Sequence, residues 1–555
     1  MLGACGTAAC VALALGVIYP SAVLVAQSFL AGGRISLVHY ARLAADLGAY
    51  RALLHSLVIS LWTTAAATAL GVLLAWLIAR TDLPRRDRWH TVLLIPYMVP
   101  PFIGAIAWVY LLNPVGYLNR TWMAFTGSPH PLFVIYGQAG IIFVLTLYEY
   151  PIAYLAAVGV LRRLNPALEE AARMARAGPW RAMRDITFPL ALPGILAGAL
   201  LVMMASLGNF GTAAILGFPA RYEVLTTRIY STILDFDRPD HFQVAAALSM
   251  WLVAIAAVAL QAQRAALRRG RYTVIGGQAS GSAAVVALGR CRRPVTLALA
   301  SFVLLAVALP MAAVLQTSLV RAYGLPAVPA NLTLRHYGTV LFDLPKARRA
   351  IIDSLGLAAG AATLIMVLGA GIAYALERCR VRGRGVVDLL VTVPYAIPGT
   401  VVALAMILAW LRPIPILGIR LYDTLGIILL AYVARFLVFG VRTTLAGLTQ
   451  VHASLEEAAR ISGATAGEAF RDILVPLIRP SLVAGWLLAF IPAVAELTLS
   501  ILLFSVGHET IGVVVFGLHD EGKIALSAAL AFLVTVMLVG LTLATKVSAP
   551  ADLGA

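Results

Sequence analysis

The sequence predicts an all-α integral membrane protein of about twelve transmembrane helices, built as two parallel six-helix repeats. Its composition is the first reason, because 61% of the 555 residues are hydrophobic, only 12% are charged, and the mean hydropathy is +0.91. Soluble domains average about half apolar and about a quarter charged residues, so this chain cannot cover itself with a polar surface. Recurring long apolar runs and an internal repeat are the other two reasons.

Twelve apolar runs are each long enough to cross roughly 30 Å of hydrocarbon as a helix. Helices are expected because an open sheet would leave backbone groups unpaired in lipid. The first run lacks a basic leader and a clear cleavage site, so we expect a retained span rather than a signal peptide. The expected spans are 7–30, 55–79, 91–112, 138–161, 193–217, 243–263, 295–318, 352–376, 387–411, 424–446, 482–505 and 525–546.

The loop charges predict the orientation of the spans. Lys and Arg are more numerous in the even-numbered loops, for example in 80–88, 264–294 and 377–384, than in the odd-numbered ones. This bias places the even loops and both termini in the cytoplasm. The net charge of +17 does not indicate nucleic-acid binding, because the arginines lie in short loops between apolar runs.

The second half of the chain repeats the first. IPYMVP at 95–100 matches VPYAIP at 393–398, and Ser56 matches Ser354, both at a spacing of 298 residues. Further on, 169–190 matches 456–477 at a spacing of 287 residues. Six spans per copy is an even number, so both copies face the same way in the membrane. We therefore expect a first unit at 1–263, a cytoplasmic linker at 264–294 and a second unit at 295–555.

The repeated segment lies in two cytoplasmic loops, 165–189 and 452–476, each with a short amphipathic helix. Asn165 is expected to cap the first helix, and Ser454 with Glu457 fits a capping box for the second. Paired acids stand near the positive end of each helix dipole. A proline closes each segment, and the next membrane span is expected to begin there. One such helix could simply rest on the membrane surface, but two ordered copies favour a shared function. The residues concerned are Glu169, Glu170, Ala171, Ala172 and Pro189, and Glu456, Glu457, Ala458, Ala459 and Pro476.

This segment resembles the EAA coupling loop of bacterial ATP-binding-cassette importer permeases. The second copy has that pattern, from Glu457 through Gly463 to Pro476. In the first copy Arg176 stands where the glycine is expected, and Gly178 follows two positions later. The resemblance extends through both halves of the chain.

The resemblance implies a multi-pass permease of the bacterial inner membrane, working with a periplasmic substrate-binding protein. It also implies that the loops dock on a homodimeric ATPase, two subunits per chain. The only Gly-Lys is Gly522-Lys523, and Ile524 follows it, so the chain has no phosphate-binding loop. We therefore expect no enzyme activity and no cofactor or metal in this chain, with ATP used by the partner.

Few ionisable groups stand at membrane depth. They are Glu149, Arg435 and Glu496, and the repeat aligns Glu496 with Asn209. Such groups line polar pathways or bond to other helices, so both roles remain open for Asn209 and Glu496. Glu149 could instead pair with Arg435.

The run at 208–217, followed by 224–230, resembles ferric-iron importer permeases of the fused two-unit type. That resemblance favours ferric iron as the substrate, with thiamine, polyamines, phosphonates and sulfate as alternatives within the same importer class. An ion-coupled secondary transporter, or a membrane scaffold without transport, are alternatives of a different kind. Neither alternative requires two coupling loops.

Overall fold

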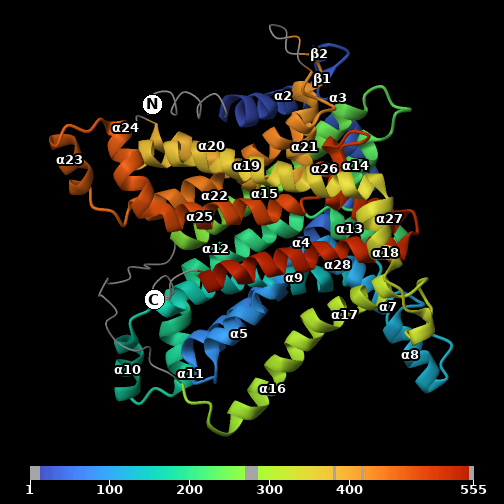
Figure 1. The fold of residues 1–555 in the computed structure, drawn as a ribbon, viewed down its shortest axis with the longest axis horizontal. Helices are drawn as coiled ribbons and strands as arrows, with labels where there is room; N and C mark the ends of the chain where they lie inside the picture. Colours follow the sequence, from blue (N-terminus) through green and yellow to red (C-terminus); the bar gives the residue numbers. More distant parts are fainter. Residues whose placement is uncertain (1–12, 269–285, 379–382, 414–417, 419, 549–555) are drawn as a thin grey trace. The chain divides into compact units, whose positions relative to one another are not determined.

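The structure is a computed structural model, and it describes residues 13–268, 286–378, 383–413, 418 and 420–548. Helices dominate this described part, and its only named strands are β1 (Leu30–Ala31) and β2 (Arg34–Ile35), an antiparallel pair. Contacts divide the chain into two compact units (Figure 1). Unit 1 comprises 1–47, 228–250 and 334–555, and unit 2 comprises 48–227 and 251–333.

The described helices of each unit follow the chain order. Those of unit 1 are η1 (Ala14–Ile18), α2 (Tyr19–Ser28), α3 (Val38–Ala45), α18 (Arg335–Gly338), η7 (Thr339–Asp343), α19 (Pro345–Arg378), α20 (Arg384–Ala396), α21 (Gly399–Trp410), α22 (Leu425–Leu448), α23 (Ser454–Ile461), α24 (Ala466–Ala469), η8 (Phe470–Leu474), α25 (Val475–Val494), α26 (Ser500–Leu503), α27 (Ile511–Asp520) and α28 (Ile524–Ser548).

Those of unit 2 are α4 (Leu47–Arg80), α5 (Arg86–Leu93), α6 (Ile95–Met98), α7 (Pro101–Leu112), α8 (Tyr117–Thr126), α9 (Gln138–Arg163), α10 (Pro166–Met174), α11 (Pro179–Ala182), η2 (Met183–Thr187), α12 (Phe188–Leu207), α13 (Gly211–Gly217), η3 (Phe218–Ala220), η4 (Gly289–Cys291), α16 (Arg292–Val303), η5 (Leu304–Ala308), α17 (Leu309–Leu319) and η6 (Pro329–Asn331). Two helices, α14 (Leu225–Ile233) and α15 (His241–Arg268), are divided between the units, and the first residue of α4, Leu47, also belongs to unit 1.

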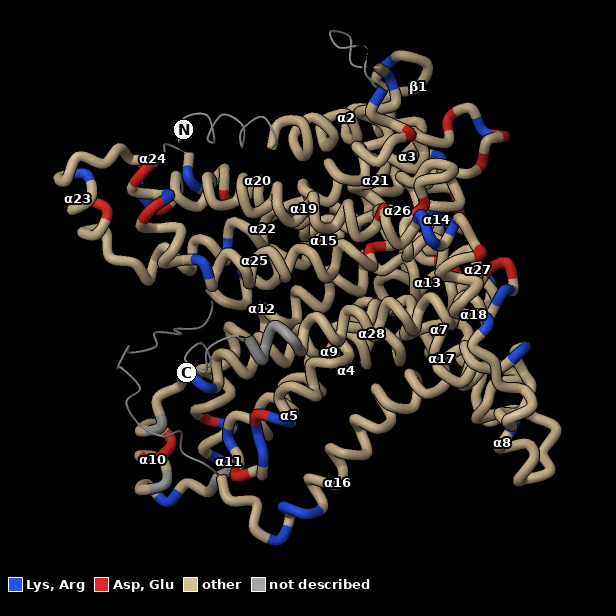
Figure 2. The backbone as a smooth tube through the Cα atoms, viewed as in Figure 1, with Lys and Arg blue, Asp and Glu red and all other residues tan. Residues whose placement is uncertain are grey.

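The helix lengths confirm the predicted fold class. Within the described residues, ten helices are long and apolar enough to cross a membrane, and α20 with α21 forms an eleventh span if that pair, bent by 108°, counts as one. The shorter apolar helix Ala14–Ser28 corresponds to the first expected span, whose residues 7–12 lie outside the described part. In each unit the charged residues gather toward the ends of the long helices and leave their middles apolar (Figure 2).

Several of the expected span boundaries differ from those in the structure, as two spans show. The span expected at 193–217 is α12, which ends at Leu207, followed by the separate helix α13. The span expected at 482–505 is likewise α25, which ends at Val494, followed by α26. Both membrane helices also begin earlier than expected, in helical stretches that start at Met183 and Ala466.

Each unit takes most of its helices from one half of the sequence and its first apolar helix from the other half. In unit 1, α2 packs against α21, and the Tyr19 hydroxyl donates to the Ala409 carbonyl over 3.3 Å. In unit 2, α17 packs against α7. The boundaries of these two contact units therefore differ from those of the units expected from the sequence. The expected units at 1–263 and 295–555 stay a prediction.

The longest helix of each repeat crosses its neighbour at a matching glycine. A Cβ on Gly71 of α4 would lie 2.7 Å from the backbone nitrogen of Tyr154 in α9. A Cβ on Gly369 of α19 would lie 2.7 Å from the carbonyl carbon of Gly440 in α22. Only glycine permits so close an approach between two helix backbones. Both units thus share one packing arrangement around these helices.

Candidate functional site

The two predicted coupling loops fold into the short helices α10 and α23 (Figure 1). The Asn165 cap is confirmed, because its side-chain oxygen accepts a hydrogen bond of 3.0 Å from the Ala167 amide. The capping box expected from Ser454 and Glu457 was wrong. Ala453 occupies the N-cap position, and the Ser454 hydroxyl lies 2.8 Å from His452 Nδ1 instead.

A capping box does form slightly later in that loop, at the start of α24. The Thr465 hydroxyl accepts from the Glu468 amide over 3.3 Å, while the Glu468 carboxylate accepts from the Thr465 amide over 2.8 Å. The sequence pattern that marks such a box, Thr or Ser followed by Glu three residues later, therefore occurs twice here and is used once.

The two acids of each pair face opposite ways. Glu169 and Glu456 are buried, with 7% and 8% of their surface exposed, whereas Glu170 and Glu457 are exposed. Successive residues of an α-helix point about 100° apart, so one carboxylate can face the unit while the next faces solvent. The alanines that follow, Ala171 with Ala172 and Ala458 with Ala459, are exposed or half-buried.

Each buried carboxylate meets an arginine at the end of a long membrane helix. Arg80, the last residue of α4, places Nε 3.7 Å from Glu169 Oε1. Arg378, the last residue of α19, places Nε 3.9 Å from Glu456 Oε2. The two arginines are 298 residues apart and the two glutamates 287, which are the two spacings of the internal repeat.

Each arginine also binds the backbone just before its coupling helix. Arg80 Nη2 donates to the Leu164 carbonyl over 3.3 Å. Arg378 Nη2 donates to the carbonyls of Val451 over 2.6 Å and Leu448 over 3.1 Å. Neither arginine was predicted from the sequence. Their matching positions in the two repeats could have indicated a shared role.

Other hydrogen bonds to the buried acids differ between the repeats. The Thr187 hydroxyl donates to Glu169 Oε1 over 2.6 Å, whereas in the second repeat the Tyr374 hydroxyl donates to Glu456 Oε1. The repeat spacings place Leu474 opposite Thr187 and Trp76 opposite Tyr374. The ion pair is therefore common to both repeats, while the neutral donor is not.

Both coupling helices end in the same turn. Arg176 has φ +60°, and Gly463, at the matching position, has φ +97°. The amide that follows each donates back to the helix, from Ala177 to Ala172 over 2.9 Å and from Ala464 to Ala459 over 3.0 Å. Arg176 thus takes the left-handed conformation that glycine usually supplies at a helix end. Gly178, which is exposed, is not needed for this turn.

The closing prolines were expected to mark the start of the next membrane span, and this was wrong. Pro189 and Pro476 are each the second residue of an α-helix, α12 and α25, but helical structure begins before them in η2 and η8. Proline has no backbone N–H and cannot donate the usual helix hydrogen bond to the carbonyl four residues back. A π-helical turn, whose hydrogen bonds reach five residues back, precedes each α-helix. The amide of Phe188 accordingly donates to Met183, five residues back.

The polar residues at the two helix breaks make structural hydrogen bonds. Asn209 Oδ1 accepts from the Thr212 amide over 3.0 Å at the start of α13. Glu496 Oε2 accepts from the Leu499 amide over 2.8 Å, the matching position before α26. Both side chains cap a short helix after a break, which explains why the repeat keeps a polar residue there.

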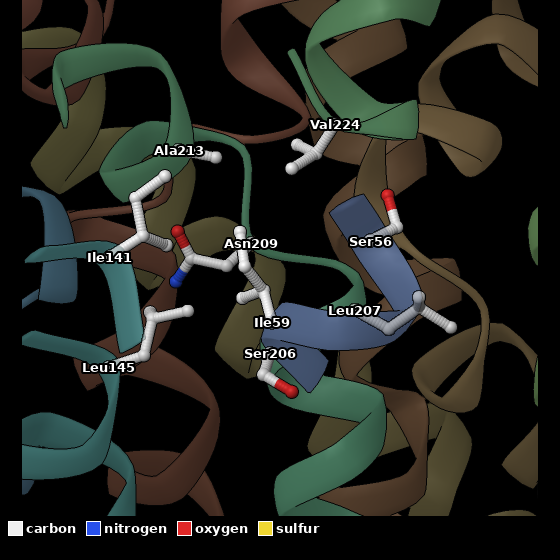
Figure 3. A pocket seen from close by; sticks show the side chains of 9 residues that line it. All are labelled: Ser56, Ile59, Ile141, Leu145, Ser206, Leu207, Asn209, Ala213 and Val224. Atoms are coloured by element: carbon white, nitrogen blue, oxygen red, sulfur yellow. The ribbon is translucent and has the colours of Figure 1, made fainter. Parts of the chain in front are cut away.

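Asn209 also borders a small cavity in unit 2. Figure 3 shows its amide directed toward Ile141 and Leu145, with Ser56 on the opposite side. The cavity volume is about 10 Å³, the smallest space that holds a water molecule. The pathway role predicted for Asn209 and Glu496 stays a prediction.

Glu149 and Arg435 belong to different units, so their pairing also stays a prediction. Glu149 is 3% exposed within α9, and its Oε2 has no hydrogen-bond partner among the described residues. Arg435 Nη1 donates to the Ile397 carbonyl over 3.1 Å, at the bend between α20 and α21.

The end of the linker is attached beside the first coupling helix. The Val286 amide donates to the Arg80 carbonyl over 2.8 Å, and the Asp82 amide donates to the Val286 carbonyl over 3.2 Å. The Leu288 amide then donates to Asp82 Oδ1 over 2.8 Å. Val286 lines a second cavity of about 10 Å³ together with Arg80 and Glu169.

Comparison with known proteins identifies relatives of both halves. A protein of Haemophilus influenzae named as a ferric transport system permease is 27% identical over 89% of this chain and 76% of its own. The ferric transport system permease protein FbpB of Actinobacillus pleuropneumoniae is 24% identical over 95% and 75%. A Salmonella paratyphi A protein named as a 2-aminoethylphosphonate transport system permease is 29% identical over 42% and 84%.

A solved structure of a bacterial transporter that imports alginate covers 44% of this chain and 87% of its own, with 22% identity and a TM-score of 0.39. The family match is the more extensive finding. Residues 67–269 and 365–551, one segment from each repeat, match the family described as "Binding-protein-dependent transport system inner membrane component". The chain therefore belongs to this family and is a multi-pass inner-membrane permease with two copies of the family unit.

Proposed function

We propose that this chain is the permease of an ATP-binding-cassette importer for ferric iron, switched by ATPase subunits that dock on α10 and α23. The observation that carries the docking proposal is the exposed face repeated on both helices. Glu170 and Glu457 face solvent there, next to small alanines that permit close approach by another protein. A membrane bundle moved by a soluble motor needs such a contact outside the lipid.

Two matching docking helices in one chain fit two identical ATPase subunits. The chain has no phosphate-binding loop of its own, because Ile524 follows its only Gly-Lys. ATP is therefore bound and hydrolysed by the partner, and this chain binds no cofactor. The excess of Lys and Arg in the even-numbered loops supports a cytoplasmic location for both docking helices and both termini. A periplasmic binding protein delivers the substrate to the opposite end.

Ferric iron is supported by the two relatives that align with almost the whole chain, since both are named as ferric transport permeases. The phosphonate relative aligns with only 42% of the chain. Phosphonate, thiamine, polyamine and sulfate are therefore the alternative substrates within the same importer class.

The helix breaks after α12 and α25 are the proposed lining of the pathway. Interrupted membrane helices place polar backbone and side chains at membrane depth, where transporters bind their substrates. Asn209 and Glu496 lie at these breaks, and Glu149 and Arg435 are further polar groups proposed to face the pathway.

Docking is tested with the double variant Glu170→Lys/Glu457→Lys, in affinity-tagged permease purified with the ATPase that accompanies it. We expect the variant to insert in the membrane but to lose the ATPase and all uptake. A matched control, Asp237→Lys/Glu521→Lys, changes two exposed acids outside the coupling loops and should retain the ATPase. Normal association of the ATPase with the coupling-loop variant would refute the docking proposal.

The substrate is tested by uptake of radiolabelled ferric iron under iron starvation, in cells that lack this chain and in cells where it is restored. Restored uptake supports iron. Equal uptake in both strains would refute iron and redirect the assay to phosphonate, thiamine, polyamine and sulfate. It would leave the docking proposal unaffected.

A further inference from the structure

The coupling helices are too short to hold their own shape. α10 has nine residues and α23 has eight, whereas isolated helices below about 12 residues are marginal in water. A docking partner can move such a helix as a lever only if something outside the helix holds it to the membrane bundle. Contacts with the rest of the unit must supply that connection.

The buried acids supply one in each repeat. Glu169 belongs to α10 and Arg80 to the last turn of α4, so their 3.7 Å contact joins a loop helix to a 34-residue membrane helix. Glu456 and Arg378 join α23 to the 34-residue helix α19 in the same way. Neither contact is local in the sequence, because the residues of each pair are separated by two further membrane segments.

The arginine also fixes where each coupling helix begins. Its guanidinium binds the carbonyl of Leu164 or Val451, two or three residues before the helix begins, and it also pairs with the carboxylate within the helix. Arginine suits this task because its guanidinium is planar and carries five N–H donors in a fixed geometry. The joint therefore holds both the entry and the first turns of the coupling helix.

We propose that the pairs Arg80–Glu169 and Arg378–Glu456 are the joints that transmit movement of the coupling helices to α4 and α19. This inference rests on the proposed function, in which the ATPase moves α10 and α23. It assigns separate tasks to the two adjacent acids of each loop. The exposed acid contacts the ATPase, while the buried acid positions the helix and passes its displacement to the membrane bundle.

Comparison of the two repeats supports this choice of pair. The hydroxyl group that donates to each buried acid comes from Thr187 in one repeat and from Tyr374 in the other. A purely structural hydrogen bond would satisfy a buried carboxylate equally well from either side. Of the side chains that contact the buried acids, the arginine occupies the same position in both repeats and the hydroxyl donor does not, so the charge pair is common to the two joints.

The test is the double variant Glu169→Gln/Glu456→Gln in the purified complex of permease, ATPase and binding protein. Glutamine keeps the shape of each side chain and can still accept from Thr187 and Tyr374, but it removes the charge. We expect the ATPase to co-purify in wild-type amount and to hydrolyse ATP, while substrate transported per ATP falls at least tenfold. If the buried acids had a merely structural role, the amount of substrate transported per ATP hydrolysed would stay unchanged.

The matched control is Asp388→Asn, which removes the charge of an exposed pair in which Asp388 Oδ1 lies 2.9 Å from Arg442 Nη1, between α20 and α22. It should leave transport per ATP unchanged. If the double variant does not insert, Glu456→Gln alone is measured, and at least a twofold loss of transport per ATP is expected.

Unchanged transport per ATP in the inserted Gln variants would overturn the inference. Loss of the ATPase from these variants would also overturn it, because the buried acids would then be docking residues. Failure of the docking proposal is seen separately, as retention of the ATPase by Glu170→Lys/Glu457→Lys. The two ideas can therefore fail independently.

Discussion

Arg176 and Gly463 adopt the same left-handed backbone conformation at the ends of the two coupling helices, 287 residues apart. Glycine takes this conformation freely, whereas for a residue with a Cβ it costs roughly 1–2 kcal/mol. The first repeat therefore makes the same turn with a less favourable residue. This comparison explains how Arg176 replaces the glycine of the motif without changing the turn.

Replacing Arg176 with glycine should stabilise the end of α10 by about 1 kcal/mol, because the strain at φ +60° is removed. Amide hydrogen exchange of the α10 backbone should slow about fivefold if it occurs through local opening. Gly463→Ala should accelerate exchange in α23 by a similar factor. No heavy atom lies within 4 Å of a Cβ at Gly463, so the effect there comes from backbone strain alone.

Gly178→Ala is the matched control for this pair of variants. A Cβ added at Gly178 would also meet open space, but Gly178 is absent from the residues with positive φ. Alanine there should leave exchange in α10 unchanged or slightly slower. Equal effects of alanine at Gly178 and Gly463 would contradict the conformational explanation.

Much of the fold could be predicted from the sequence, because membrane length and repetition are linear signals. Apolar runs located most of the spans. Short sequences that occur in both halves, such as Ser56-Leu57 and Ser354-Leu355, located the two copies. The structure gives these serines a physical reason, since their hydroxyls accept from the amides of Leu225 and Ile511 over 2.7 and 2.8 Å. The helix breaks at Gly208 and Ala495 could not be seen, because apolar residues continue on both sides.

The candidate site was predicted as a set of residues but not as an arrangement. The motif gave both acids of each pair, yet hydropathy does not say which of two adjacent glutamates faces the protein. That depends on where the helix begins, and the expected cap at Ser454 was wrong. Arg80 and Arg378 were missed because their partners are distant in the sequence and contact them only in the folded chain.

Gly369→Ala should prevent the normal approach of α19 and α22. The new methyl group would lie 2.7–2.9 Å from three backbone atoms of Gly440 and Val441, which cannot move aside as a flexible side chain can. Overpacking of this kind costs about 1–3 kcal/mol or more. We expect a clear loss of folded protein, measured by size-exclusion chromatography of a fluorescent fusion in detergent.

Gly356→Ala, in the same helix, is the control for Gly369→Ala. No heavy atom lies within 4 Å of a Cβ at Gly356, and alanine favours helices over glycine by about 1 kcal/mol. This variant should therefore be at least as stable as the unmodified protein. Equal losses at the two positions would point to a general intolerance of α19 rather than to its crossing with α22.

Asp82→Ala should release the end of the linker from the first repeat. The Asp82 carboxylate accepts the Leu288 amide over 2.8 Å, and a hydrogen bond to a charged group contributes about 1.5–3 kcal/mol. Trypsin cleavage at the exposed Arg290 should accelerate about tenfold or more. Asp87→Ala is the control, since this nearby acid is exposed and only its backbone carbonyl accepts a bond, from Thr91. Unchanged cleavage of the Asp82 variant would show that other contacts hold the linker.

His519 should make the protein less stable in acid. Burial lowers the pKa of His519 to about 4, against a smaller opposing effect of the Asp520 carboxylate. In the unfolded chain the pKa of this histidine is about 6.5. Between about pH 4 and pH 6.5 the unfolded chain therefore binds a proton here, while the folded chain keeps the ring neutral. The stabilisation that comes from the neutral ring is fully present above pH 6.5 and is lost as the pH falls toward 4. The loss in the free energy of unfolding is at most about 3 kcal/mol, because the side chain is only half-buried.

The variant His519→Gln should flatten this part of the acid-sensitivity profile, because glutamine does not titrate. Thermal inactivation temperatures measured between pH 7 and pH 4 would show a smaller decrease for the variant than for the unmodified protein. His130→Gln, which changes an exposed histidine, should keep the full decrease. If both variants retained the same decrease, the acid sensitivity would come from groups other than His519.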